Sequence, residues 1–121
     1  MVKVLAVDDS DVVRSQVRKA LENGGYQVVE AVNGLDGLEK AQANPDVKLV
    51  VCDVNMPEMD GLMMCTKLRE ISSFKTVPIF MLTTESSPEM KAQGKAAGVT
   101  AWMIKPFNPE KMVAAVKKVI G

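Results

Sequence analysis

The pattern of apolar and polar positions divides the chain into five short apolar runs that alternate with five segments of helical periodicity. The runs are rich in β-branched residues and are bounded by turn-forming residues, which is typical of strands. They cover residues 2–7, 26–31, 48–53, 77–83 and 100–105. The third run has no polar alternation, as expected of a strand buried on both faces of a parallel sheet. This order predicts a doubly wound α/β fold, in which helices cover both faces of a five-stranded parallel sheet.

Capping residues and apolar stripes mark the five helices. Asn33 and Asn108 are expected N-caps, and residues 86–89 read as a capping box that opens the fourth helix. The third helix is expected to end at Ile71, and the fourth, which offers little but alanine to the core, should be the loosest. The side chains expected to face the core are Val13, Val17, Ala20 and Leu21, then Leu35, Leu38 and Ala41, then Met64, Leu68 and Ile71, and finally Met112, Val113, Val116, Val119 and Ile120.

Composition and charge narrow the class of protein. The chain has 121 residues, enough for one domain with an ordinary core, and both Lys plus Arg and Asp plus Glu total 15. The balanced charge argues against nucleic-acid binding, which needs a basic face. The sequence has no histidine, which excludes a Cys/His zinc site and a Ser-His-Asp triad.

The cysteines and the start of the chain predict a cytoplasmic protein. Cys52 and Cys65 lie in apolar contexts and are expected to be reduced and buried. The first residues run directly into a predicted strand and leave no room for a signal peptide. No apolar run has the length of a membrane span, so we expect no membrane association.

Polar side chains stand where four of the predicted strands end. Asp8 and Asp9 follow the first strand, Asp53 ends the third, Thr83 ends the fourth and Lys105 ends the fifth. In a parallel sheet these ends share one edge, where α/β proteins bind ligands. Three carboxylates brought together repel one another, and Mg²⁺ would relieve the repulsion. A metal ion, an ammonium and a hydroxyl around an ionised aspartate suit phosphoryl transfer to that aspartate.

The motifs at these strand ends resemble the receiver domain of bacterial two-component response regulators, above all the stand-alone CheY-type chemotaxis regulators. The residues that carry the resemblance are Asp8-Asp9, Asp53 with Asn55-Met56-Pro57, Met59-Asp60-Gly61, Thr83 and Lys105-Pro106-Phe107. The resemblance covers the whole chain. It implies a flavodoxin-like sheet with the strand order 2-1-3-4-5, a monomer, and a single receiver domain over residues 1–121 without an output domain.

The resemblance also implies a role for each residue of the site. Asp53 would accept a phosphoryl group from a histidine kinase of the chemotaxis type, with Mg²⁺ as cofactor. Asp9 and Asp53 would ligate the metal ion directly, Asn55 would contribute its backbone carbonyl, and Asp8 would act mostly through water. Lys105 would pair with the phosphoryl oxygens. The protein would not be an enzyme in the usual sense, but a phosphoacceptor that assists its own phosphorylation and dephosphorylation.

The resemblance further implies that phosphorylation of Asp53 changes a surface of the protein to which a partner binds. Thr83 would move to bond the phosphate, Trp102 would turn inward, and the Lys105–Pro106 peptide would be cis. The altered surface of the fourth helix, fifth strand and fifth helix would bind a downstream partner such as the flagellar motor switch protein. Trp102 stands where Tyr or Phe is usual and Thr84 where a smaller residue is common, which leaves the switching geometry open.

Asn55 and Glu85 each lie two residues beyond a site residue, Asp53 and Thr83 respectively. In the family these positions help to set the lifetime of the phosphoryl group by positioning or blocking the attacking water. The combination of Asn and Glu resembles that of fast-resetting chemotaxis regulators. We therefore expect a short-lived phosphorylated state.

Other functions remain open at this point. The same chemistry would serve a phosphorelay intermediate or a phosphate sink. A small phosphohydrolase with an aspartyl-phosphate intermediate typically has a second carboxylate two residues beyond the nucleophile, where this chain has Asn55. A flavodoxin should have a Ser-, Thr- and Gly-rich phosphate loop after the first strand, where Asp8 and Asp9 would repel an anion.

Overall fold

The five predicted apolar runs form one parallel sheet in the computed structural model, which describes residues 1–121. The strands are β1 (Lys3–Val7), β2 (Gln27–Ala31), β3 (Val47–Cys52), β4 (Ile79–Thr83) and β5 (Ala101–Ile104). Their spatial order is β2-β1-β3-β4-β5, and every neighbouring pair is parallel. The doubly wound fold and the strand order 2-1-3-4-5 are therefore confirmed.

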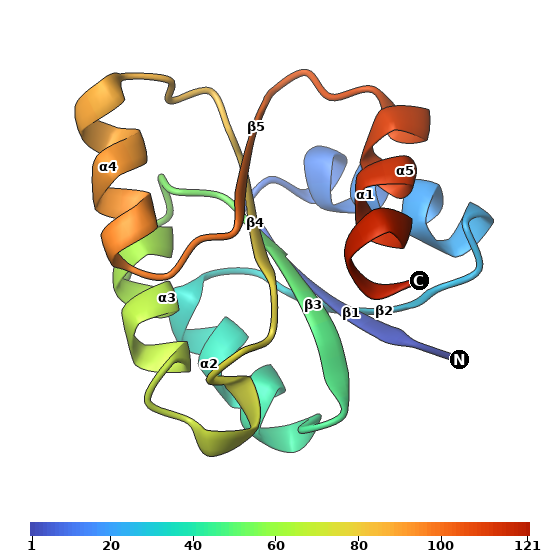
Figure 1. Cartoon of the computed structure of the whole chain (residues 1–121), viewed down its shortest axis with the longest axis horizontal. Helices are drawn as coiled ribbons and strands as arrows, with labels where there is room; N and C mark the ends of the chain where they lie inside the picture. Colours follow the sequence, from blue (N-terminus) through green and yellow to red (C-terminus); the bar gives the residue numbers. More distant parts are fainter.

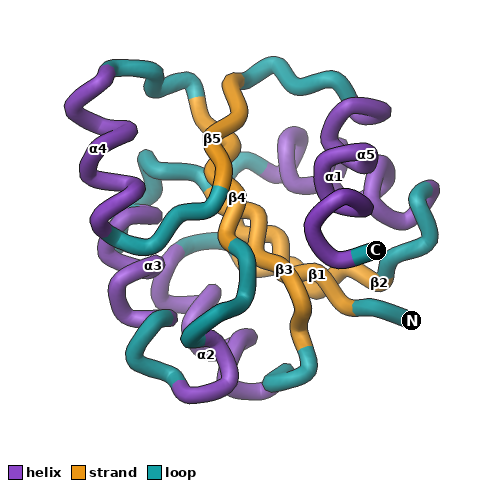
Figure 2. Tube along the Cα trace, viewed as in Figure 1, coloured by secondary structure: helices purple, strands orange, loops and turns teal.

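Helices cover the two faces of the sheet in a layered arrangement that Figures 1 and 2 show edge-on. The helices are α1 (Asp11–Asn23), α2 (Gly34–Ala43), α3 (Gly61–Leu68), α4 (Pro88–Ala96) and α5 (Pro109–Ile120). Helices α1 and α5 lie on one face of the sheet, and α2, α3 and α4 lie on the other. None of these helices combines the length and the apolar character that crossing a bilayer would need.

The core consists of two apolar clusters, one on each face of the sheet. Successive residues of a strand point to opposite faces, so Val50 and Cys52 join the cluster beneath α2 and α3, while Leu49 and Val51 join the one beneath α1 and α5. This division explains why β3 is apolar at consecutive positions. Cys52 and Cys65 are buried and free, as predicted, with their Sγ atoms 3.9 Å apart.

The rotation of two helices differs from the prediction. Leu35 and Val119 were expected to face the core, but they are 45% and 42% exposed. Helix α2 instead turns Gly37 toward the sheet, so close that a Cβ there would lie 2.7 Å from Sδ of Met64. Helix α5 buries Met112 and Val116, which puts Val119 on the outer side of the last turn. In α2, close glycine packing sets the buried face, a contact that apolar spacing does not reveal.

The third helix ends three residues earlier than expected, at Leu68 rather than Ile71. The chain tightens there into a short 3₁₀ turn, Ser72–Phe74, which places the ring of Phe74 in the core at 0% exposure. Arg69 holds this segment. Its guanidinium donates to the carbonyls of Phe74 and Val77 at 2.7 Å and to that of Gly98 at 2.6 Å.

The start of α4 also differs from the prediction. The N-cap is Ser87, whose hydroxyl accepts from the Met90 amide at 3.1 Å, and Pro88 occupies the first turn. Because the cap lies one residue later than the expected box requires, Glu89 cannot serve as its partner. Gly94 is the one buried residue of α4, in keeping with the sparse apolar face of this helix.

We predict that Arg69→Met destabilises the fold by about 2–3 kcal/mol, because three carbonyls lose a charged donor and no carboxylate is freed in return. Urea unfolding measures the loss. Arg18→Met is the matched control: it removes an arginine whose ion pairs to Glu22 and Glu30 are partly exposed, so it should cost well under half as much. Equal losses in the two variants would contradict a special role for Arg69.

Candidate functional site

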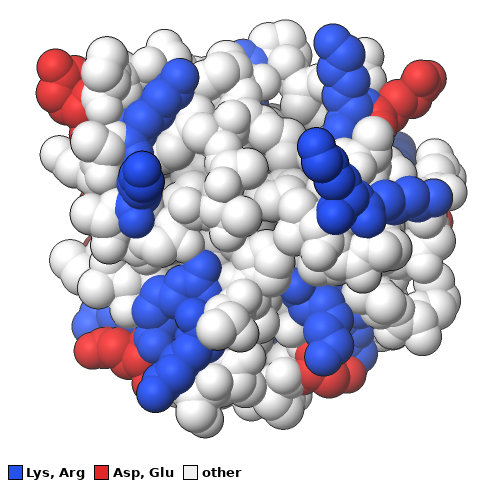
Figure 3. All heavy atoms as spheres, viewed as in Figure 1, with Lys and Arg blue, Asp and Glu red and all other residues white.

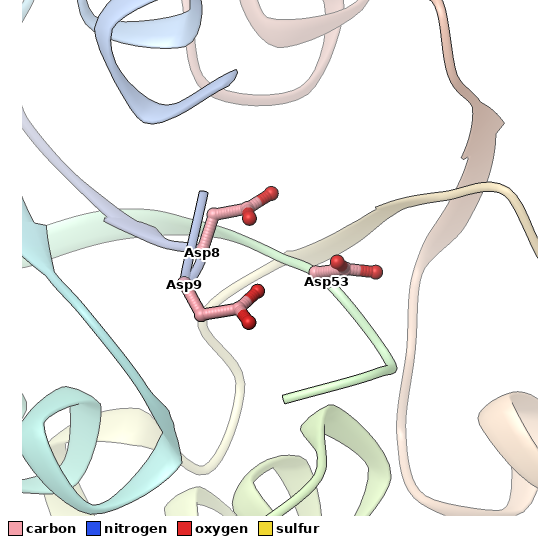
Figure 4. Close-up of side chains that lie close together, drawn as sticks. All are labelled: Asp8, Asp9 and Asp53. Atoms are coloured by element: carbon pink, nitrogen blue, oxygen red, sulfur yellow. The ribbon is translucent and has the colours of Figure 1, made fainter. Parts of the chain in front are cut away.

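The carboxyl ends of β1 and β3 bring three acidic side chains together. Asp8 and Asp9 form the turn after β1, and Asp53 directly follows β3. One carboxylate oxygen from each lies within 4.8 Å of the others, and Figure 4 shows the three side chains close together, with Asp8 and Asp9 on the turn after β1 and Asp53 beside them. The adjacent pairing of β1 and β3 produces this convergence: the Asp53 amide donates to the Val7 carbonyl at 3.1 Å, which extends the ladder to the site.

Lys105 supplies the positive charge of the site. Its Nζ lies 2.9 Å from Asp8 Oδ2 and 3.0 Å from Asp53 Oδ2, with 15% of the side chain exposed. Burial acts to lower the pKa of Lys105, but the hydrogen bonds to Asp8 and Asp53 and the negative charges of these two residues together outweigh it and raise the pKa above its usual value. For Asp8, burial dominates and raises the pKa of the carboxyl despite its bonds to Lys105 and the Ser10 amide. The bonds from Lys105 thus offset the burial of Asp8 only in part.

Backbone amides hold the two buried carboxylates in place. The Ser10 amide donates to Asp8 Oδ1 at 2.9 Å, and the Val54 amide donates to Asp53 Oδ1 at 2.7 Å. The chain after Asp53 folds back so tightly that a Cβ at Gly61 would lie 2.0 Å from the Asp53 carbonyl oxygen. Position 61 therefore requires glycine, and its amide bonds the Val54 carbonyl at 2.8 Å.

The donor set fits a hard divalent cation. All three groups are carboxylates, the single ammonium leaves two negative charges in excess when all three are ionised, and Asp9 is exposed where water can complete a coordination shell. Mg²⁺ needs only one or two carboxylates and keeps several waters. Burial raises the pKa of Asp8 and so disfavours its ionised form, which a cation bound beside it would favour.

Glu85, in the loop between β4 and α4, links the remaining predicted residues. Its backbone amide donates to Thr83 Oγ1 at 3.2 Å, its carbonyl accepts from the Trp102 indole at 2.7 Å, and its carboxylate accepts from Nδ2 of the Asn55 side chain at 3.0 Å. The indole lies against Gly94, where a Cβ would be 2.7 Å from Trp102 Cζ3. The ring is therefore already docked on α4.

The structure arranges the predicted residues in two groups, one around the carboxylates and one around Glu85. Asp8, Asp9, Asp53 and Lys105 form one cluster, and the Lys105–Pro106 peptide is cis as expected. Thr83 is fully buried, and the hydrogen bonds of Glu85 join it to Trp102. The role of the Asn55 carbonyl stays a prediction.

Sequence reasoning missed how Glu85 and the backbone take part. Glu85 was expected to act on the lifetime of a phosphoryl group, but two of its three links use backbone atoms, which residue type does not reveal. The amides of Ser10 and Val54 escaped notice for the same reason. Thr84, the residue after β4, is exposed.

The sequence and the fold match known proteins. A family model described as the response regulator receiver domain matches residues 4–117. Chemotaxis protein CheY1 of Helicobacter pylori is 40% identical over 120 residues, which cover 98% of this chain and 97% of that protein. Sensor histidine kinase CheAY of the same organism is 36% identical over 120 residues, covering 97% of this chain but 15% of that kinase. The structure of Vibrio cholerae CheY4 aligns with a TM-score of 0.94 and 46% identity, covering 98% of each chain.

We predict that Asp8→Asn stabilises the metal-free protein at pH 7 by about 1 kcal/mol, a few degrees in Tm, because it removes a desolvated charge. A raised pKa means that the folded state holds this proton more tightly than the unfolded state, so wild-type stability falls as pH rises through the titration of Asp8. The advantage of the variant should therefore shrink toward pH 4. Thermal melts in EDTA across this range measure it.

The matched control is Asp46→Asn, an exposed carboxylate whose pKa is lowered by a hydrogen bond from Lys3. Its ionised form is favoured by folding, so the substitution should cost slightly at pH 7 and nothing in acid. An Asp8→Asn protein less stable than the wild type at pH 7 would mean that Lys105 neutralises the cluster fully.

Proposed function

The chain belongs to the response regulator receiver family, whose members signal by phosphorylation, and from this premise we propose that Asp53 accepts a phosphoryl group from a chemotaxis-type histidine kinase to control the flagellar motor. The observation that carries the proposal is the position of the Asp53 carboxylate, held by an amide and an ammonium beside two further carboxylates. The kinase and the motor target are inferred from relatives named as chemotaxis proteins.

Asp53 needs no general base, because an ionised carboxylate is already a nucleophile. One of its oxygens forms a bond to phosphorus as the bond from phosphorus to the kinase's imidazole nitrogen breaks, and the imidazole keeps the electron pair of that bond. Lys105, now 3.0 Å from Asp53, can follow the new charge onto the phosphoryl oxygens. Asp8, Asp9 and Asp53 would hold Mg²⁺, which supplies charge neutralisation to the transferring group.

Thr83 and Glu85 provide a route from the site to the surface. The Thr83 hydroxyl accepts from the Glu85 amide and still has its own proton to donate. If Thr83 moves to bond the phosphoryl group, the Glu85 amide loses its acceptor and the loop can shift. The Glu85 carbonyl holds the Trp102 indole at 2.7 Å, so the shift would be transmitted to α4 and β5.

The face formed by α4, β5 and α5 suits a partner that is acidic at its edges and apolar at its centre. Figure 3 shows Lys and Arg side chains over α4 and α5 on both sides of an uncharged area. Ile104 of β5 is 43% exposed in this region. The two helices carry two glutamates and five exposed lysines, which are Lys91, Lys95, Lys111, Lys117 and Lys118. We place the motor target on this face.

A first prediction concerns phosphorylation itself. Acetyl phosphate with Mg²⁺ should add one phosphoryl group to the wild-type chain and none to Asp53→Asn, as measured by intact mass after a rapid acid quench. Trp102 fluorescence should change when beryllofluoride is added in the presence of Mg²⁺, because the indole bonds the loop that follows Thr83. A wild-type chain that gains no mass would overturn the proposal, while a mass gain with constant fluorescence would remove only the route through Trp102.

A second prediction concerns the lifetime of the phosphorylated state. The Asn55–Glu85 hydrogen bond spans the mouth of the site with two polar side chains that can orient water. The phosphoryl group should therefore decay within minutes at neutral pH, and Asn55→Met should slow the decay several-fold, since a thioether cannot orient water in this way. Loss of the added mass over time measures the rate. A wild-type half-life of hours would contradict the expectation, as would an unchanged rate in the variant.

A further inference from the structure

Arg14 of α1 lies under the acidic turn and contacts three separate parts of the chain. Its Nη1 donates to the Asp8 carbonyl at 2.8 Å, its Nη2 to Asp11 at 2.6 Å and its Nε to Glu30 at 3.2 Å. Only 13% of the side chain is exposed. A planar guanidinium can serve all three acceptors at once because its donors form a fixed fork.

Asp9 has no comparable support of its own. Its side chain is exposed and has no hydrogen-bond partner within the chain, although it is one of the three converging carboxylates. Its place therefore depends on the backbone that carries it. The Asp8 carbonyl and the Asp9 amide belong to one rigid peptide plane, so a donor that fixes this carbonyl also fixes the direction in which Asp9 leaves the turn.

We propose that Arg14 is a positioning residue for the metal site, which holds the peptide between Asp8 and Asp9 so that Asp9 faces Asp53. Arg14 touches neither the acceptor carboxylate nor the entering group, and acts through the turn. The inference rests on the proposed function, because it assumes that the acidic cluster binds Mg²⁺.

Glu30, the penultimate residue of β2, keeps Arg14 in place. Its carboxylate accepts from Arg14 through one oxygen and pairs with Arg18 Nε at 3.3 Å through the other. Because β2 pairs directly with β1, with Glu30 opposite Ala6, the bracing group is tied to the strand that leads into the acidic turn. Arg18 shares this anchor but makes no contact with the turn, which makes it a matched control.

The sign of the effect separates positioning from simple electrostatics. A positive charge near three carboxylates opposes the binding of another cation. If Arg14 acted through its charge alone, its removal would therefore tighten Mg²⁺ binding. Loss of positioning would weaken it, because the carboxylates would have to be ordered when the ion binds. A metal site that loses support from its outer shell typically weakens by about tenfold or more.

The experiment measures the Mg²⁺ dissociation constant by isothermal titration for the wild type, Arg14→Met, Arg14→Lys and Arg18→Met, with urea stability recorded for each. We expect Arg14→Met to weaken binding about tenfold. Arg14→Lys should not restore it, because one ammonium cannot span the three acceptors. Arg18→Met should stay within about twofold of the wild type, whatever its loss of stability.

Each other outcome decides against the inference. Tighter or unchanged binding in Arg14→Met would overturn it, and full rescue by lysine would replace positioning by a charge effect. Weakening of similar size in Arg18→Met would reduce the effect to general loss of structure. A wild-type chain that binds no Mg²⁺, with Asp9→Asn as its null control, would instead refute the metal site of the proposed function.

Discussion

The convergence of Asp8, Asp9 and Asp53 at one edge of the sheet is the constraint on which the rest of the structure depends. Parallel pairing of β1 and β3 forces the three carboxylates together, and burial of Asp8 raises its pKa, so the corner is held at a cost in stability. Lys105 offsets part of this cost from the end of β5. A site that is short of positive charge is one that a metal ion and an incoming phosphoryl group can change strongly.

The same constraint explains how the surrounding loops are built. Each carboxylate that is buried takes a backbone amide, from Ser10 or Val54, and the chain after Asp53 turns so closely that only glycine fits at position 61. The loop after β4 is different, because Glu85 makes all its links by single hydrogen bonds to Thr83, Asn55 and Trp102. The turns that hold Asp8 and Asp53 are thus fixed by close packing and backbone bonds, whereas the loop of Glu85 can adjust by breaking single hydrogen bonds.

Most of this arrangement could be predicted from the sequence, because each strand and the polar residue at its end are neighbours along the chain. Asp53 follows four consecutive apolar residues, 49–52, and parallel order places the carboxyl ends of all the strands on one edge, so the cluster could be predicted without coordinates. Packing between residues that are far apart in the sequence could not be predicted in this way. Leu35 faces solvent because Gly37 lets α2 approach Met64. The segment after the early end of α3 is held by Arg69, which bonds two nearby carbonyls, those of Phe74 and Val77, and the distant carbonyl of Gly98. Contacts through backbone atoms, such as those of Glu85, leave no trace in residue type.

The contact between Trp102 and Gly94 has a consequence for how such chains can diverge. A methyl group at position 94 would lie 2.7 Å from the indole, so a larger residue on α4 would have to be accompanied by a smaller ring on β5. Position 94 on α4 and position 102 on β5 therefore form a pair whose side-chain sizes must match. A substitution at one position limits which side chains the other position can accept. Transplanting α4 from a relative without its strand partner would leave either a clash or a gap beneath the docking face.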